Sequence, residues 1–269
     1  MKRFLSFAAL LLAFALSSRA GVGDSRNLGE KDWGEVNNLA AANGKLYAAT
    51  PVHLWEVETS GAAKKMAAPK DWGRTPRVAA LDGKVYAINE SRLFEIDKGR
   101  FRKLVDDIGA RAMVPAGGKL YMVSGTELLA VDKEGKVTGL GGDWYNFGGM
   151  AALGDRIYII SRNRLHEVTL EGTGRPLDVV FDQPNTMVAG EGKLYVLAKE
   201  KSSNAANGTF NETRLFEVEP ATGQRTTLPL PQGMRLVDTA SAMTYLDGKL
   251  YLSVPTMGGR SNFFSVSVR

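Results

Sequence analysis

Apolar and polar positions alternate along this chain in short runs that are separated by turn residues. Runs such as RVAALD, GKVYAIN and RLFEID follow one another closely, without long helical segments between them. A period of two is that of a β-strand with one covered face, and near-continuous apolar runs belong to strands that are covered on both faces. The pattern therefore predicts an all-β protein of short antiparallel strands.

The order of these runs recurs about every forty residues. A GKLY-like motif ends at six tyrosines: Tyr47, Tyr86, Tyr121, Tyr158, Tyr195 and Tyr251. The residue eight positions before each tyrosine is apolar in every copy: Leu39, Val78, Met113, Met150, Met187 and Met243. A second motif follows in each copy, as LWEVE, LFEID, LLAVD, LHEVT, LFEVE or FFSVS. Matches in one register predict six copies of one structural unit.

Each unit is expected to form four strands. A glycine turn such as Asp82-Gly83 joins the first two strands, and a shorter, more variable run provides the fourth. Four-stranded units of this length are typical of a β-propeller, whereas a solenoid would need polar caps at both ends. The sixth unit lacks a fourth strand, and residues 26–30 precede the first unit. We therefore predict a single six-bladed propeller domain over residues 21–269, in which this N-terminal segment completes the last blade and removes an exposed sheet edge.

These motifs resemble the repeats of six-bladed propeller proteins in general. The resemblance includes Kelch-like repeats and the Trp-marked repeats of tectonin- and tachylectin-type lectins, and it covers the predicted mature chain at the level of the repeat. It implies the fold and carries over no functional residue. Only Gly117-Gly118 supplies a Kelch-type glycine pair at the first hairpin, and the spacing inside the repeat differs from that of tectonin.

Residues 1–20, MKRFLSFAALLLAFALSSRA, have the charged start, apolar run and small residues of a secretory signal peptide. Cleavage after Ala20 would leave 31 cationic and 29 acidic side chains, which argues against nucleic acid as a partner. We expect a secreted or periplasmic protein with no transmembrane segment in its mature chain. The absence of cysteine excludes disulfides and thiolate metal sites.

The segments that link successive blades carry a recurring aromatic residue. KDWG occurs twice in the same register, and the residues fourteen positions before the repeat tyrosines are Trp33, Trp72, Asp107, Trp144, Phe181 and Val237. Antiparallel strands reverse direction at every turn, so these links should share one face with the hairpins between second and third strands. That face also receives two insertions, a polar loop over residues 199–213 and a shorter one over residues 255–261.

Two interpretations of the link aromatics remain open. The rings of Trp33, Trp72, Trp144 and Phe181 could be platforms for sugar rings or for side chains of a peptide. Alternatively, they could pack between blades, with each indole N–H bonded to a backbone carbonyl. A change of Trp72 to Ala distinguishes the two, because a platform residue should affect binding and a packed residue should affect stability.

The mouth of the propeller channel is the other candidate site. The residues just before the inner-strand apolar positions should line it, including Asn37, Arg77, Arg111 and Asn185, with Asp238 slightly earlier in its blade. Asparagines with one or two acids could hold calcium, whereas the two arginines suit an anionic or polar ligand. No cofactor is expected otherwise.

The remaining polar residues of the repeat do not indicate catalysis. Glu56, Glu95, Glu167 and Glu217 recur in the third strand, which predicts pairing with Lys or Arg on a neighbouring strand. The two histidines, His53 and His166, lack metal-ligand spacing and a placed nucleophile. The preferred hypothesis is an exported, non-catalytic recognition or scaffold module that binds a glycan or protein through its loop face. The alternative is a calcium-dependent hydrolase resembling propeller lactonases, with its site at the channel mouth.

Overall fold

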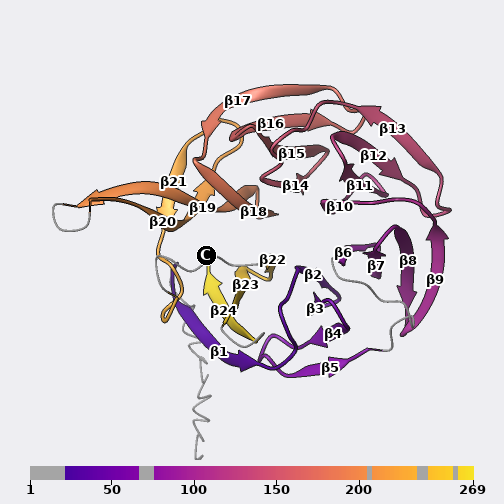
Figure 1. Ribbon diagram of the computed structural model, residues 1–269, viewed down its shortest axis with the longest axis horizontal. Helices are drawn as coiled ribbons and strands as arrows, with labels where there is room; N and C mark the ends of the chain where they lie inside the picture. Colours follow the sequence, from indigo (N-terminus) through magenta and orange to yellow (C-terminus); the bar gives the residue numbers. More distant parts are fainter. Residues whose placement is uncertain (1–21, 67–75, 205–207, 235–241, 257–259) are drawn as a thin grey trace, which may run out of the picture.

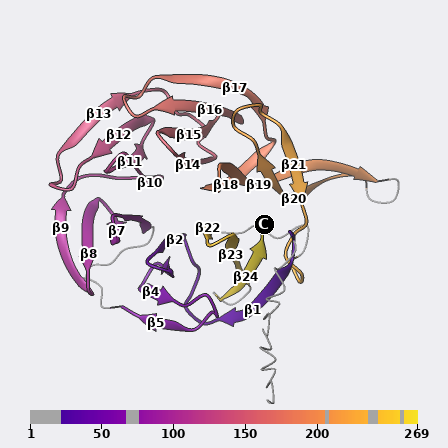
Figure 2. The same ribbon diagram turned by 180° about the vertical axis from the view of Figure 1, so that it is seen from behind.

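The computed structural model describes residues 22–66, 76–204, 208–234, 242–256 and 260–269, which form a ring of six antiparallel sheets with four strands each (Figures 1 and 2). The first strand of each blade lies at the centre of the ring and the fourth at the rim. The predicted all-β, six-bladed propeller is therefore confirmed. Within the described residues, no helix is long and apolar enough to span a bilayer.

The strands occur in the predicted order. Those of blades one and two are β2 (Asn38–Ala42), β3 (Lys45–Ala49), β4 (Leu54–Val57), β5 (Ala63–Lys65), β6 (Arg77–Leu81), β7 (Lys84–Asn89), β8 (Arg92–Asp97) and β9 (Arg100–Val105). Those of blades three and four are β10 (Ala112–Ala116), β11 (Lys119–Ser124), β12 (Glu127–Val131), β13 (Val137–Gly141), β14 (Gly149–Leu153), β15 (Arg156–Ser161), β16 (Arg164–Thr169) and β17 (Gly174–Val180). Those of blades five and six are β18 (Gln183–Gly190), β19 (Lys193–Asn204), β20 (Gly208–Val218), β21 (Arg225–Leu228), β22 (Ala242–Leu246), β23 (Lys249–Pro255), β24 (Ser261–Ser267) and β1 (Ser25–Lys31).

The N-terminal strand closes the ring as predicted. β1 pairs antiparallel with β24, from Ser25 opposite Val266 to Lys31 opposite Ser261, with a bulge between Asn27 and Glu30. Backbone bonds before β1 extend the pairing, since Gly23 N–H donates to the Ser267 carbonyl at 2.7 Å. Blade six therefore combines strands from both ends of the chain, and the outer edge of β24 is covered.

In five of the six blades, the first hairpin contains two consecutive residues with positive φ. Asp82 and Gly83 have φ values of 50° and 75°, and Asp247 and Gly248 have values of 49° and 77°. Two consecutive residues in this region match the twist of a two-residue hairpin. Glycine tolerates the conformation because it has no Cβ. The glycine that starts the GKLY-like motif in these five blades thus fixes the register of the two inner strands.

The hydrophobic core is divided among the interfaces between neighbouring blades. Six clusters of buried side chains each join two adjacent sheets around the ring. The six inner-strand apolar positions and the six repeat tyrosines are all buried. The repeat motifs therefore identify the residues that hold blade against blade.

The recurring glutamates form ion pairs with cations on the second strand, as predicted. Lys45 pairs with Glu56 at 2.6 Å, and Lys84 pairs with Glu95 at 3.1 Å. The equivalent pairs in blades four and five are Arg156 with Glu167 at 3.1 Å and Lys193 with Glu217 at 3.4 Å. In each pair the cation lies at the start of the second strand, beside the first hairpin.

The insertion of blade five continues the strands instead of forming the polar loop that its composition suggests. The β19–β20 ladder extends from Leu194 opposite Val218 to Asn204 opposite Gly208. Only its inner part is paired on both sides, because β18 begins with Gln183 opposite Lys199 and β21 ends with Leu228 opposite Leu215. The two-stranded ribbon projects past the rim of the ring (Figure 1).

Candidate functional site

The loop face is defined here as the face that carries the blade links and the hairpins between second and third strands. Backbone hydrogen bonds join the links before blades three, four and five to the hairpin of the preceding blade. Ile108 N–H donates to the Ser91 carbonyl at 2.8 Å, and Phe181 N–H donates to the Asn163 carbonyl at 2.8 Å. The side chain of Ser261 likewise bonds to the Gly34 carbonyl at 3.1 Å. The prediction that links and hairpins share one face is therefore confirmed.

The link aromatics do not form exposed platforms. Trp33, Trp144 and Phe181 are 5%, 7% and 1% exposed. Each packs against a ring from the third strand of its own blade, with centroid distances of 6.1 Å for Trp33–Trp55, 5.5 Å for Trp144–His166 and 5.8 Å for Phe181–Phe216. The platform interpretation is wrong for these three residues, because the link carries each ring inward onto the sheet. Trp72 lies outside the described residues.

In blade three, the buried position of the link aromatic is occupied by the residue that follows the one indicated by the fourteen-residue spacing. Ile108 makes the backbone bond that Trp144 and Phe181 make in their blades, and its side chain is 3% exposed. Asp107, the residue at the expected position, has a positive φ of 54°. A one-residue shift in the link therefore places an aliphatic side chain where other blades have an aromatic ring.

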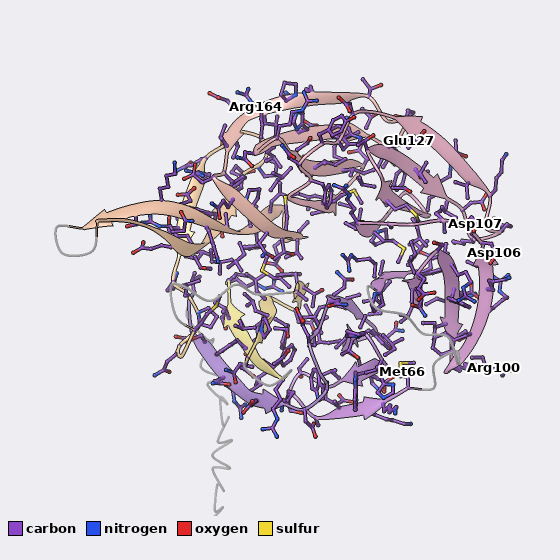
Figure 3. All side chains as sticks on the ribbon, in the orientation of Figure 1. Met66, Arg100, Asp106, Asp107, Glu127 and Arg164 are labelled. Atoms are coloured by element: carbon purple, nitrogen blue, oxygen red, sulfur yellow. The ribbon has the colours of Figure 1, made fainter. Side chains whose placement is uncertain are left out.

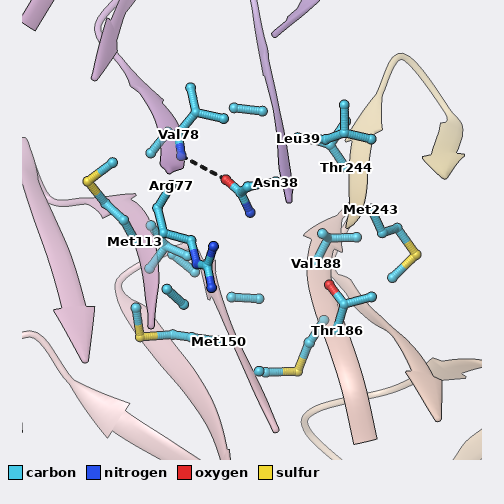
Figure 4. Close-up of a pocket in the computed structure, with 18 of the residues that line it drawn as sticks. Asn38, Leu39, Arg77, Val78, Met113, Met150, Thr186, Val188, Met243 and Thr244 are labelled. Atoms are coloured by element: carbon cyan, nitrogen blue, oxygen red, sulfur yellow. Dashed lines mark hydrogen bonds between the residues drawn. The ribbon is translucent and has the colours of Figure 1, made fainter. Parts of the chain in front are cut away.

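The centre of the ring contains a cavity of about 320 Å³. The polar side chains Asn37, Asn38, Arg77, Arg111, Asn185 and Thr186 line its loop-face end, and small residues of the inner strands, including Ala41, Ala80, Ala152 and Ala189, line it further in. Four of the five residues predicted for the channel mouth thus lie together in one lining. Figure 4 shows this cavity, with Arg77 labelled. The fifth, Asp238, lies outside the described residues.

Side chains at the mouth bond to the inner edges of the blades. The side-chain oxygen of Asn38 accepts a hydrogen bond from the Val78 N–H at 2.8 Å. The Arg77 guanidinium donates through Nε to the Arg111 carbonyl at 2.7 Å and through Nη1 to the Pro76 carbonyl at 3.1 Å. Burial lowers the pKa of Arg77 from its ordinary value.

Metal coordination has little support within the described part of the chain. No group of three or more His, Cys, Asp or Glu side chains is close enough there to hold an ion. The described cavity lining contains two arginines and no carboxylate. A hard cation such as calcium requires oxygen ligands that include carboxylates, so the described lining does not fit calcium.

A second candidate surface, not predicted from the sequence, lies on the loop face of blade four. The ring of Tyr145 is half-exposed, and the Arg162 guanidinium lies over it at 5.5 Å from the ring centroid. The Tyr145 carbonyl accepts hydrogen bonds from the Ser161 hydroxyl at 2.7 Å and the Arg162 N–H at 3.1 Å. Val180, which is opposite Arg164 in the ladder, is 49% exposed beside the same hairpin. We call Tyr145, Arg162 and Val180 the blade-four patch.

The base of the projecting ribbon is fixed next to this patch. Arg225 donates to the Val180 carbonyl at 2.7 Å and pairs with Glu200 of β19 at 2.8 Å. Its guanidinium also lies over the rings of Phe181 and Phe216, at 5.2 Å and 4.8 Å. The Lys201 N–H donates to the Asp182 carboxylate at 3.1 Å. Ribbon and patch are thereby held as neighbours on the ring.

One feature of the sequence could have indicated the patch. Trp144 and Tyr145 are adjacent aromatic residues in the link to blade four, and the first is buried whereas the second is half-exposed. Two adjacent aromatic residues in one link could have indicated that one ring faces solvent. The ribbon gave no such signal, because its polar composition is also that of a loop.

Comparisons with known proteins support the fold and leave the function open. No protein-family model matches the chain, and no curated protein matches it by sequence. Among solved structures, a gluconolactonase from Xanthomonas campestris is similar with a TM-score of 0.67 and 12% identity over 93% of this chain and 91% of that chain. The structure of YjhT is similar with a TM-score of 0.66 and 13% identity over 88% of this chain and 95% of that chain.

Other similar structures differ in function. A virginiamycin B lyase from Staphylococcus aureus is similar with a TM-score of 0.59 and 10% identity, over 90% of this chain and 98% of that chain. A chain of a nidogen–laminin complex is similar with a TM-score of 0.58 and 14% identity, over 78% of this chain and 84% of that chain. At such identities the similarity establishes a propeller architecture that is shared by enzymes and by members of protein complexes.

Proposed function

We propose that this chain is an exported, non-catalytic recognition module that binds a protein partner through the loop face of blades four and five. The observation that carries the proposal is the blade-four patch beside a ribbon that projects from the ring. Tyrosine and arginine are the residue types that most often dominate the binding energy of protein interfaces. Here the tyrosine backbone is fixed by two hydrogen bonds, so that binding would cost little ordering of the ring.

The ribbon favours a protein over a glycan as the partner. Beyond Lys199 on β19 and before Leu215 on β20, neither strand has a further neighbour in the sheet. Such edges offer backbone donors and acceptors that an extended segment of another protein can pair with. A sugar makes no use of a strand edge. The nidogen–laminin complex is one case in which a similar fold belongs to a protein assembly.

Site-specific photo-crosslinking tests the proposal. A photoreactive phenylalanine analogue at position 145 should capture a discrete protein from an envelope or culture-fluid fraction of the source cells. The matched control is the same analogue at position 137, because Val137 is 41% exposed at the start of β13, on the opposite face. The proposal predicts adducts from position 145 that a Tyr145→Ala, Arg162→Ala competitor fails to suppress, although the unaltered protein suppresses them.

Other outcomes would contradict the proposal. Equal capture from positions 145 and 137 would show non-specific adhesion. Binding to a glycan array that is lost on Tyr145→Ala would replace the protein partner with a sugar. A calcium-induced rise in melting temperature that a chelator reverses would favour the metal-dependent hydrolase.

A further inference from the structure

We propose that the loop-face mouth of the central channel binds a small oxyanion, a carboxylate or a phosphate group, between Arg77 and Arg111. The site is separate from the blade-four patch and does not depend on the proposed protein partner. Within the described cavity lining, these two arginines are the only charged side chains. Two cations in a shared concave space with no described counter-charge attract an anion more strongly than either would on a flat surface.

Arg77 is already positioned for such a ligand. Its Nε and Nη1 donate to two backbone carbonyls, which fix the plane of the guanidinium. No described residue accepts a hydrogen bond from Nη2, and Figure 4 shows the guanidinium directed into the space between the inner strands. Burial that lowers the pKa of Arg77 also means that the cation has lost part of its hydration. An oxyanion would replace that hydration with a charge-assisted hydrogen bond.

Arg111 places a second guanidinium at the same point of the ring. Its carbonyl is the acceptor for Arg77 Nε, so the starts of the two inner strands are in direct contact. The Arg111 side chain is exposed and lines the cavity, and none of its guanidinium donors bonds to a described residue. Arginine presents several N–H donors in a planar fork that matches the oxygens of carboxylate and phosphate.

The rest of the lining indicates what the anion would be attached to. Asn37, Asn185 and Thr186 place amide and hydroxyl groups around the mouth, and alanines leave space further in. A cavity of about 320 Å³ is at the lower end of the range for small-molecule sites, roughly 300–1,000 Å³. These features fit a compact, hydroxylated molecule with one anionic group, such as a sugar acid or a sugar phosphate.

Two measurements on the full mature chain test this inference. In the first, the arginine Nε–Hε signals are followed by NMR while acetate or inorganic phosphate replaces chloride at constant ionic strength. Saturable shifts of the Arg77 and Arg111 signals are expected. In the second, calorimetry compares glucose, glucuronate and glucose 6-phosphate. At least one of the two anions should bind tenfold or more tightly than glucose, and the better one identifies carboxylate or phosphate as the preferred group.

Variants connect the binding to the site. Arg111→Gln should weaken binding of the preferred anion about tenfold or more, because the substitution removes one full charge that no described residue neutralises. Arg164→Gln is the matched control, since Arg164 is an exposed arginine at the rim of blade four (Figure 3). Arg77→Lys retains the charge without the fork and should also weaken binding. The proposal would be overturned if neither acetate nor inorganic phosphate produced saturable shifts. It would also be overturned if Arg111→Gln and Arg164→Gln bound the preferred anion with equal affinity.

Discussion

Asn38 and Val78 join blades one and two, because the Asn38 side-chain oxygen accepts a hydrogen bond from the Val78 N–H at 2.8 Å. The innermost strand of a propeller blade has no strand neighbour on its channel side, so its backbone groups there need other partners. Arg77 provides the same kind of link from blade two to blade three, through the Arg111 carbonyl. Residues that precede the repeated apolar position thus fix the spacing of the inner strands and shape the channel mouth.

Replacement of Asn38 tests this role. Asn38→Ala should lower the free energy of unfolding by about 1–2 kcal/mol, because the Val78 N–H loses its partner at a half-buried site. Asn185→Ala is the control, since Asn185 lies at the same mouth and no described residue bonds to its side chain. That variant should stay within roughly 0.5 kcal/mol of the unaltered protein. Urea unfolding measures both, and equal losses would remove the special role of Asn38.

Trp144 and Tyr145 are adjacent in the link to blade four, and we expect the first to contribute to stability and the second to partner binding. Trp144→Ala should cost about 3–5 kcal/mol of stability, because the ring is buried against His166 and lies in the cluster between blades three and four. Tyr145→Ala should cost under about 1 kcal/mol and should instead reduce crosslinking to a partner. Thermal unfolding of both variants provides the comparison. A large loss of stability in Tyr145→Ala would move that residue into the core.

The sequence predicted the architecture of this protein better than its surface. Met150 packs in the interface with blade three and Tyr158 in the interface with blade five, and the equivalent residues of the other units pack in the same way. The repeated pattern therefore reveals strand number and order. The exposure of Trp144 could not be inferred in this way, since a recurring aromatic slot fits both a platform and a packed ring. The ribbon was missed because residues 199–213 lack hydrophobic alternation, and this alternation is the signal from which strands are recognised.

Glu95 of blade two should make the free energy of unfolding depend on pH. Burial acts to raise the pKa of Glu95, but hydrogen bonds from Arg102 and Lys84 outweigh it and hold the pKa below its ordinary value of 4.5. The folded state therefore keeps the carboxylate charged at a pH where the unfolded chain takes up a proton. The stabilisation is complete above about pH 5 and is lost as pH falls through the lowered folded pKa.

Glu95→Gln should remove this contribution. At pH 7 the loss should be about 1.5–3 kcal/mol, since charged hydrogen bonds to a buried side chain disappear. The difference from the unaltered protein should shrink as pH falls below about 4.5. Glu56→Gln is the control, because the Glu56 side chain is 27% exposed and should contribute under about 1 kcal/mol. A constant difference from pH 7 to pH 3 would contradict the assignment.

Ring closure by β1 allows the last prediction. Removal of residues 22–31 would uncover the outer edge of β24 and one side of the cluster that contains Trp33 and Phe263. We expect the truncated chain to lose cooperative unfolding or to aggregate, because an unpaired edge beside apolar side chains recruits other chains. A synthetic peptide of residues 22–31 should raise its melting temperature in a concentration-dependent manner, since it binds only the folded ring. A scrambled peptide should not. Unchanged unfolding of the truncated chain would mean that five complete blades hold β22 to β24 without the N-terminal strand.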